Sequence, residues 1–268
     1  MSINRKGTAL ITGASSGIGA IYADRLARRG YDLIIVSRNR AKLDQLATRL
    51  GTQTRRSVEV LTADLSDSGD LARVEETLRR DSRITFLVNN AGTGSFGPLL
   101  QSDVSKADEM IALNIRALTR LTYAAVPAMV ARGTGTIVNI SSIVAISPET
   151  LNGVYGGSKA YVLAFSHSLQ HELTSKGIRV QAVLPGATAT DFWEAGGMPV
   201  SNLPADWVMS AENLVDSALV GLDLGELVTI PALADPTEWD TFEASRRAMS
   251  THLSRREPAA RYGVGAAS

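Results

Sequence analysis

The 268-residue chain contains no cysteine. It therefore has no disulfide, no thiolate metal ligand and no cysteine nucleophile, and a cytoplasmic location is the default expectation. It also carries no net charge, because 27 lysine and arginine residues balance 27 aspartate and glutamate residues. Without excess positive charge there is no counterion release to drive general nucleic-acid binding, so we expect no nucleic-acid partner.

Long apolar runs are lacking as well. No run approaches the ~18 residues that a membrane helix needs, so we expect no membrane association. The apolar stretch 9–11 is shorter than the roughly 7–15 residues of a signal-peptide core. Hydrophobic residues nevertheless make up 44% of the chain and charged residues 20%, which is ordinary for a globular protein with a full core.

Short apolar segments alternate along the chain with stretches of helical periodicity. We expect strands at residues 8–12, 33–36, 58–63, 84–88, 136–140 and 178–184. Long helices are expected over about 103–131, where Pro127 should kink or end the helix, and over 155–175. Apolar strands joined by helices indicate an α/β fold with a parallel sheet that is covered on both faces.

No linker or repeat divides the chain, so we expect one domain over residues 1–268. Residues 187–209 break the rhythm with Pro and Gly clusters and no clear period. A connection of this length often covers a substrate site, so a substrate lid is expected there. Residues 256–268 are expected to form a flexible tail.

A glycine-rich turn, residues 13–19, follows the first strand and opens a helix. Glycines there permit a tight turn, and the helix N-terminus favours the charge of a pyrophosphate. The spacing is Gly-x3-Gly-x-Gly, which differs from both the common dinucleotide fingerprint and the Walker A loop. The alternative is a turn that merely packs.

The second strand ends in Ser37 and Arg38, with no acidic residue in reach. NAD sites place an Asp or Glu near this point for the ribose 2′-hydroxyl, whereas an arginine suits the 2′-phosphate of NADP. Arg38 can pair with that phosphate bidentately or stack on adenine. The alternative is a solvated surface arginine.

Tyr155 and Lys159 are spaced i, i+4 and share one face of a helix. A nearby cation favours the phenolate, which lets a tyrosine act as acid or base near neutral pH. Ser142, at the end of the strand before this helix, strengthens the case, because a sheet presents its reactive groups at that edge. The alternative is an amphipathic helix with an exposed lysine.

Together these motifs resemble those of the short-chain dehydrogenase/reductase family. Residues 12–19 match its cofactor turn, 89–92 its Asn-Asn-Ala-Gly segment, and Pro185-Gly186 the motif after its sixth strand. Its catalytic tetrad falls on Asn114, Ser142, Tyr155 and Lys159. The resemblance spans about residues 8–230. It implies a doubly wound, Rossmann-type parallel sheet of about seven strands, and a homodimer or homotetramer.

The resemblance also implies roles for these residues. Tyr155 would exchange a proton with the substrate oxygen and Ser142 would orient that oxygen. Lys159 would hold the nicotinamide ribose and lower the pKa of Tyr155, and Asn114 would support a water linking Lys159 to solvent. The cofactor would be NADP(H), bound by these residues and by a larger set: Gly13, Ser15, Ser16, Gly17, Ile18, Gly19, Ser37, Arg38, Asp64, Leu65, Asn90, Ala91, Gly92, Pro185, Gly186, Thr188 and Thr190.

The sequence departs from common members at Gly156-Gly157, where close approach of cofactor or backbone would explain the glycines. His167 and His171 share a helix face but lack the zincin glutamate and a third ligand, so no metal is expected. Apolar residues gather in the loops near the predicted site, which favours an apolar substrate. They are Phe96, Leu151, Phe192, Trp193, Met198 and Trp207.

We therefore predict an NADP(H)-dependent oxidoreductase acting on a small-molecule carbonyl or secondary alcohol. One alternative is an idle member of the same fold that senses nucleotide or binds a partner. Another is dehydration or epimerisation by a relative of this fold.

Overall fold

A computed structural model describes residues 6–95, 97–151 and 153–264. The chain divides into two compact units, residues 1–231 and 232–268, which are described separately. Within the described residues, no helix is both long and apolar enough to cross a membrane.

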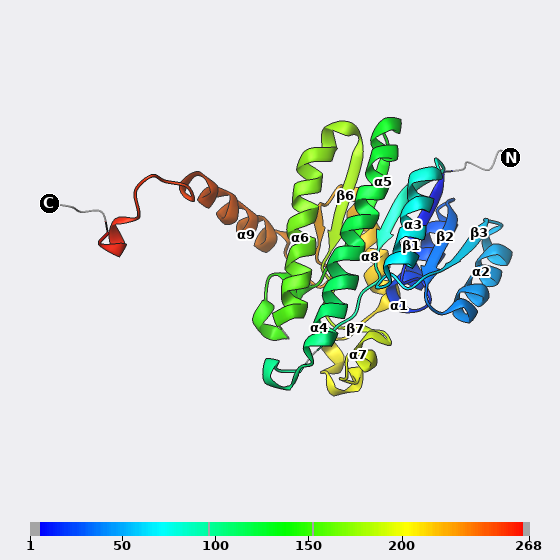
Figure 1. Cartoon of the computed structure of the whole chain (residues 1–268), viewed down its shortest axis with the longest axis horizontal. Helices are drawn as coiled ribbons and strands as arrows, with labels where there is room; N and C mark the ends of the chain where they lie inside the picture. Colours follow the sequence, from blue (N-terminus) through cyan, green and yellow to red (C-terminus); the bar gives the residue numbers. More distant parts are fainter. Residues whose placement is uncertain (1–5, 96, 152, 265–268) are drawn as a thin grey trace. The chain divides into compact units, whose positions relative to one another are not determined.

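The first unit is built on a seven-stranded parallel sheet in the order β3-β2-β1-β4-β5-β6-β9. Figure 1 labels β1, β2, β3 and β6 of this sheet. The predicted fold class is thereby confirmed. The strands are β1 (Thr8–Thr12), β2 (Asp32–Ser37), β3 (Val58–Thr62), β4 (Ile84–Asn89), β5 (Gly135–Ile140), β6 (Ile178–Val183) and β9 (Val228–Thr229). The order reverses beside β1, so the loops after β1 and β4 diverge and leave a crevice at the carboxyl edge of the sheet.

Helices cover both faces of this sheet. The first face packs against α1 (Gly17–Arg28), α2 (Arg40–Thr54) and α8 (Ala211–Leu224), and the second against α3 (Ser68–Arg80), α5 (Leu118–Arg132) and α6 (Gly153–Leu173). Adjacent strand residues alternate between the two cores: Ile11 and Ile35 belong to the first, Leu10 and Ile34 to the second. Burial on both faces explains why the strands are apolar without alternation.

The helical region predicted at 103–131 consists of α4 (Val104–Ile111), a π-helical segment at Ala112–Ala117 and α5. Pro127 does not end the helix, which continues to Arg132. A proline inside a helix removes one i→i−4 hydrogen bond, and here the carbonyl that loses its donor belongs to the exposed Tyr123. The π segment was not predicted, and it carries Asn114.

Residues 187–209, drawn in yellow in Figure 1, leave the main sheet after β6. Their ends are joined by a separate two-stranded parallel sheet, in which β7 (Thr188–Ala189) pairs with β8 (Met209–Ser210). The backbone N–H of Met209 donates to the carbonyl of Ala187 at 2.9 Å. Between them lie the short helix α7 (Phe192–Ala195) and two 3₁₀ turns, at Val200–Asn202 and Ala205–Trp207.

The second unit contains α9 (Pro236–Met249) and 3₁₀ turns at Ser250–His252 and Ala260–Tyr262. Asp235 caps α9 by accepting from the N–H of Thr237, and Pro236 occupies the first turn. The tail predicted at 256–268 therefore contains one helical turn within its described part.

Candidate active site

Ser142 and Tyr155 meet at the carboxyl end of β5. The strand ends at Ile140, and the Ser142 hydroxyl then caps a 3₁₀ turn by accepting from the N–H of Val144 at 3.3 Å. Tyr155 lies in the first turn of α6 and is joined to Ser142 by a side-chain hydrogen bond. The two hydroxyls that the sequence places thirteen residues apart are thus brought together, which is the arrangement needed to bind one substrate oxygen.

Tyr155 sits in an apolar enclosure. It forms a small core with Met110 of α4 and Val144, flanked by Leu151, Val154 and Phe192. Burial raises the pKa of Tyr155 to about 12, and the hydrogen bond from Ser142 opposes this rise. The structure differs here from the expected lowering of the Tyr155 pKa, because removal of the phenol from water outweighs every favourable interaction with the phenolate.

Lys159 lies one helical turn after Tyr155 and is 6% exposed. Its Nζ donates to the carbonyl of Ile140 at 3.0 Å and lies 5.7 Å from the centroid of the Tyr155 ring. Burial lowers the pKa of Lys159 to about 8. The alternative interpretation, an amphipathic helix with an exposed lysine, is therefore excluded.

Asn114 connects this group to the loop after β4. Its Oδ1 accepts from the N–H of Thr93, and its Nδ2 donates to the Thr93 carbonyl, both at 2.9 Å. The same Nδ2 donates to Ser158 Oγ at 3.1 Å, and Ser158 Oγ donates to the Tyr155 carbonyl. A π bulge reorients side chains within a helix and is frequent at functional sites.

Two positioning residues were missed in the sequence. Ser158 links Asn114 to the turn of α6 between Tyr155 and Lys159, and Ser141 donates its hydroxyl hydrogen bond to the carbonyl of Lys159 at 2.8 Å. Each stands next to a predicted site residue, and both are buried. Adjacency to Ser142 and Lys159 was the only signal available.

The glycine turn is tight in the way its predicted role requires. Gly13 has φ +65°, and a Cβ there would lie 2.7 Å from Asn90 Nδ2. A Cβ on Gly19 would lie 2.4 Å from the carbonyl oxygen of Gly13. The first turn of α1 holds no acidic residue, so its free N–H groups and the helix dipole favour an anion. Ser15, Ser16 and Ile18 are all partly exposed along this turn.

The neighbouring loop is tied to the glycine turn by Thr12. Its hydroxyl accepts from the N–H groups of Asn90 and Ala91, both at 3.0 Å, while Asn90 Nδ2 donates to the carbonyls of Thr12 and Gly13. A Cβ on Gly92 would lie 3.2 Å from Asn114 Oδ1 and 3.6 Å from Lys159 Nζ. The segment 90–92 therefore runs from the glycine turn to Lys159.

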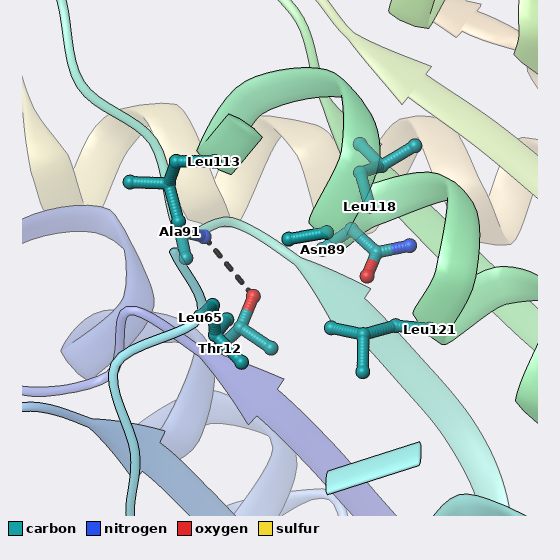
Figure 2. Close-up of a pocket in the computed structure, with 8 residues that line it drawn as sticks. Thr12, Leu65, Asn89, Ala91, Leu113, Leu118 and Leu121 are labelled. Carbon is teal, nitrogen blue, oxygen red and sulfur yellow. Dashed lines mark hydrogen bonds between the residues drawn. The ribbon is translucent and has the colours of Figure 1, made fainter. Parts of the chain in front are cut away.

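A small depression, without room for a water molecule, lies beside this loop (Figure 2). Two predicted cofactor residues, Leu65 and Ala91, line it together with Leu113, the residue before Asn114. The dashed line in Figure 2 is the hydrogen bond between Ala91 and Thr12. Tyr155 and Ser142 do not line it.

Arg38 extends into solvent beyond the end of β2. Its side chain is 77% exposed, and its Nη1 lies 3.8 Å from Oδ2 of Asp64, the residue predicted at the adenine. Ser37 is buried and accepts from the N–H of Asn39 at 3.2 Å. The structure brings the cation and Asp64 together at one corner of the crevice, and the long Asp64 contact leaves the guanidinium available to a ligand.

The residues that follow β6 contact both the turn that contains Ser142 and the glycine turn. The carbonyl of Pro185 accepts from the Ile143 N–H at 3.0 Å and from the Ser142 hydroxyl at 3.4 Å. Thr188 donates its hydroxyl hydrogen bond to Gly186, and the Thr190 methyl lies 2.9 Å from a Cβ built on Gly17. The start of segment 187–209 therefore lies against the glycine turn.

The apolar loop residues that we expected around the substrate do not form a single cluster in the part of the chain that the structure describes. Leu151 and Phe192 pack beside Tyr155, and Trp193 is buried, with its Nε1 donating to the Thr188 carbonyl at 2.9 Å. Met198 is partly exposed, and Trp207 is 68% exposed. Phe96 lies outside the described residues.

The two glycines after Tyr155 differ from each other. A Cβ on Gly156 would lie 3.2 Å from Pro148, so the expected close approach of backbone is present there. A Cβ on Gly157 would have no neighbour within 4 Å among the described residues. The expectation is confirmed for the first glycine only.

The family model for short chain dehydrogenases matches residues 7–197 of this chain. The chain belongs to the short-chain dehydrogenase family. Among curated relatives, the very-long-chain 3-oxoacyl-CoA reductase of Anas platyrhynchos is 38% identical over 186 residues, which cover 68% of this chain. The match spans 60% of the length of that relative.

Two solved structures resemble this chain over nearly its whole length. A short-chain dehydrogenase from Sphingobium yanoikuyae, in complex with NADPH, is 48% identical with a TM-score of 0.92, covering 94% of this chain and 98% of its own. The bulky-bulky ketone specific alcohol dehydrogenase from Comamonas testosteroni is 43% identical with a TM-score of 0.89, covering 97% and 99%.

Proposed function

We propose that this protein is an NADP(H)-dependent oxidoreductase that interconverts a bulky, apolar ketone and its secondary alcohol. The observation that carries the proposal is the hydrogen bond between Ser142 and Tyr155 inside an apolar enclosure, with Lys159 one turn away. Two hydroxyls that converge in a buried, apolar site can both donate a hydrogen bond to one carbonyl oxygen.

Tyr155 acts as the general acid and base. During reduction it donates its proton to the carbonyl oxygen, and during oxidation the phenolate takes the proton from the alcohol. Ser142 donates a second hydrogen bond to the same oxygen, which stabilises the negative charge that develops there. The high pKa of Tyr155 keeps the phenol protonated before reaction, which suits reduction at neutral pH.

Lys159 stabilises the phenolate and binds the ribose next to the reacting ring. A Cβ on Gly92 would lie 3.6 Å from its Nζ, and the pKa of about 8 leaves Lys159 largely protonated at neutral pH. The attraction between the Lys159 ammonium and the Tyr155 phenolate becomes stronger during catalysis, because water leaves the site. Asn114 holds the helix turn that contains Lys159 through Ser158.

The crevice suits a nicotinamide dinucleotide. NADP(H) supplies or accepts the hydride when bound. The crowded glycine turn lets backbone reach the pyrophosphate, and Arg38 would pair with the 2′-phosphate at the far end. The NADPH in the Sphingobium structure supports this choice.

The substrate class follows from the walls of the site. Met110, Val144 and Phe192 surround Tyr155 with apolar surface, and residues 187–209 would act as the lid that closes over the substrate. The substrate named for the Comamonas enzyme supports a bulky ketone. The cytoplasmic location remains a prediction.

Turnover of the purified full chain tests the proposal. NADPH absorbance is followed with a diaryl ketone, a small aliphatic ketone, an aldehyde and a 3-oxoacyl thioester. We expect the diaryl ketone to be reduced fastest. Binding of NADPH without consumption of any substrate would favour an idle nucleotide-sensing protein, and preference for the acyl thioester would move the substrate class toward that of the duck reductase.

A further inference from the structure

The π-helical segment Ala112–Ala117 carries two polar side chains that leave it in different directions. Asn114 is buried, and its amide is bonded to Thr93 in the loop after β4 and to Ser158 of α6. Arg116 lies two positions later and is exposed. Helical residues two positions apart do not face each other, so Arg116 cannot share the partners of Asn114. The reaction described above makes no use of Arg116.

Arg116 holds the loop that follows β3. Its Nη2 donates a hydrogen bond to the carbonyl oxygen of Ser66 at 2.6 Å. A hydrogen bond from a charged donor is shorter and roughly twice as strong as one between neutral groups. The two residues are 50 positions apart in the sequence. The loop is therefore fixed from outside, by a segment that also belongs to the reacting end of the site.

Ser66 in turn orients the carboxylate of Asp64. The backbone N–H of Ser66 donates to Oδ1 of Asp64 at 2.9 Å, and Oδ2 of Asp64 lies 3.8 Å from Nη1 of Arg38. The N–H of Asp64 donates to a carboxylate oxygen of Asp70 at 2.8 Å. Because Ser66 is held by Arg116 and itself holds Asp64, a displacement of Ser66 would move the Asp64 carboxylate.

The loop borders the crevice in which the proposed cofactor binds. β3 lies next to β2, and ligands of such sheets bind outside the carboxyl ends of the strands. The N–H of Ala63 donates to the carbonyl of Ser37 at 3.0 Å, so the loop begins beside the end of β2. Leu65 is buried and lines the depression of Figure 2 together with Ala91 and Leu113. A shift of the loop would therefore change the wall of the crevice.

We propose that Arg116 is a positioning residue for the adenine half of the cofactor, acting through Ser66 and Asp64. The inference rests on the proposed NADP(H) function. Asn114, from the same segment, holds the helix of the reacting groups, so one helical turn fixes both ends of the crevice. The role of Arg116 differs from that of Arg38, because NADPH and NADH share the adenine and only NADPH carries the 2′-phosphate.

Dissociation constants of NADPH and NADH, measured by titration calorimetry on the full chain, test the proposal. Arg116→Met keeps an apolar stem but removes the donors. We expect it to raise both constants by the same factor, roughly three- to tenfold. Turnover with saturating cofactor should change less than about twofold, because binding that is shared by the ground and transition states does not affect kcat. Arg116→Lys keeps one charged donor and should recover most of the affinity.

Arg120→Met is the matched control for a loss of stability. Arg120 lies four residues after Arg116, and its Nη2 donates to Oε2 of the buried Glu75 at 3.0 Å. This bond joins α5 to α3 and does not reach the loop after β3. Arg120→Met should therefore lower the Tm, while both dissociation constants stay at their wild-type values.

Arg116→Met with wild-type dissociation constants overturns the proposal. So does weaker binding of NADPH alone, which would assign Arg116 to the 2′-phosphate, and an effect that vanishes at high salt, which would mean a general attraction of phosphate charge. Equal weakening in Arg120→Met would reduce the effect to stability and also overturns it. A wild type that binds neither cofactor refutes the proposed function, and this inference with it.

Discussion

The ring of Phe192 lies 5.8 Å from the ring of Tyr155, centroid to centroid, and the two planes meet at 44°. Phe192 comes from the short helix of segment 187–209, so one side chain of the proposed lid packs directly against the proposed proton donor. A ketone that reaches Tyr155 must share this space with the phenyl ring. Phe192 is therefore expected to set the size of the substrate.

Phe192→Ala should favour larger ketones. Removal of the ring opens volume for a second bulky substituent and deprives a small ketone of an apolar contact, and such differences correspond to about 1–3 kcal/mol. We expect the ratio of kcat/KM for a diaryl ketone to that for a small ketone to rise at least about tenfold. Trp207→Ala, at an exposed position outside the cluster, is the control and should leave the ratio unchanged. An unchanged ratio in Phe192→Ala would remove Phe192 from the substrate pocket.

Tyr155→Phe should abolish turnover while NADPH still binds. The substitution removes the hydroxyl bonded to Ser142 but keeps the ring in its apolar enclosure. Acid–base catalysis contributes roughly 10²–10⁴-fold, so the residual rate should be below about a hundredth of wild type. Tyr123→Phe, on an exposed tyrosine of α5, is the matched control. A Tyr155→Phe enzyme that keeps more than that fraction would need another proton donor.

Deprotonation of Lys159 should lower kcat/KM for NADPH at alkaline pH. A lysine is charged below its pKa and neutral above it, so the ammonium is lost as pH rises through about 8. We expect kcat/KM for NADPH to fall over that range, since this parameter reports the free enzyme. Lys159→Ala should bind NADPH more weakly, as measured by titration calorimetry, and should also turn over more slowly. Its kcat/KM should no longer fall as the pH rises through about 8. Damage to only one of the two would contradict the double role.

Arg38→Ala should remove most of the preference for NADPH over NADH. A charge-assisted hydrogen bond contributes roughly 1.5–3 kcal/mol, which corresponds to an increase in KM for NADPH on the order of ten- to a hundredfold. NADH lacks the 2′-phosphate, so its KM should change little. Arg40→Ala is the control, because Arg40 is already bonded to Asp44 at 2.8 Å. Equal kcat/KM for the two cofactors in the wild type would refute the assignment.

Gly157→Ala should stabilise the protein, and Gly156→Ala should not. Glycine inside a helix costs roughly 0.5–1 kcal/mol relative to alanine, and a Cβ at Gly157 meets nothing within 4 Å among the described residues. At Gly156 the Cβ would press on Pro148 at 3.2 Å. Urea unfolding of both variants measures the difference, and a Gly157→Ala protein no more stable than Gly156→Ala would contradict it.

The sheet and most of the site residues could be predicted because their signals are local. A buried strand is a continuous apolar run, and Tyr155 and Lys159 need only a helical repeat to share a face. The pKa of Tyr155 could not be predicted, since its rise depends on Met110 and Phe192, which reach it from distant segments. The π segment at Asn114 has no sequence signature in this chain.

Helix α9 was not predicted for a different reason. Asp235 followed by Pro236 is a helix-start signal, but the apolar residues that follow are too few to show a clear helical period. The seventh strand, β9, has only two residues, too few for any periodicity. Its place in the sheet is set by pairing with β6, a contact between residues 46 positions apart in register.

The pairing of β7 with β8 anchors both ends of segment 187–209. Because the Met209 N–H and the Ala187 carbonyl already hold its two ends together, the chain between them closes a loop whose ends are fixed. Lengthening a closed loop costs little, about 0.6 kcal/mol for each doubling. We therefore expect the exposed part of this segment, residues 199–207, to tolerate changes of length and sequence while Ser142, Tyr155 and Lys159 stay in place.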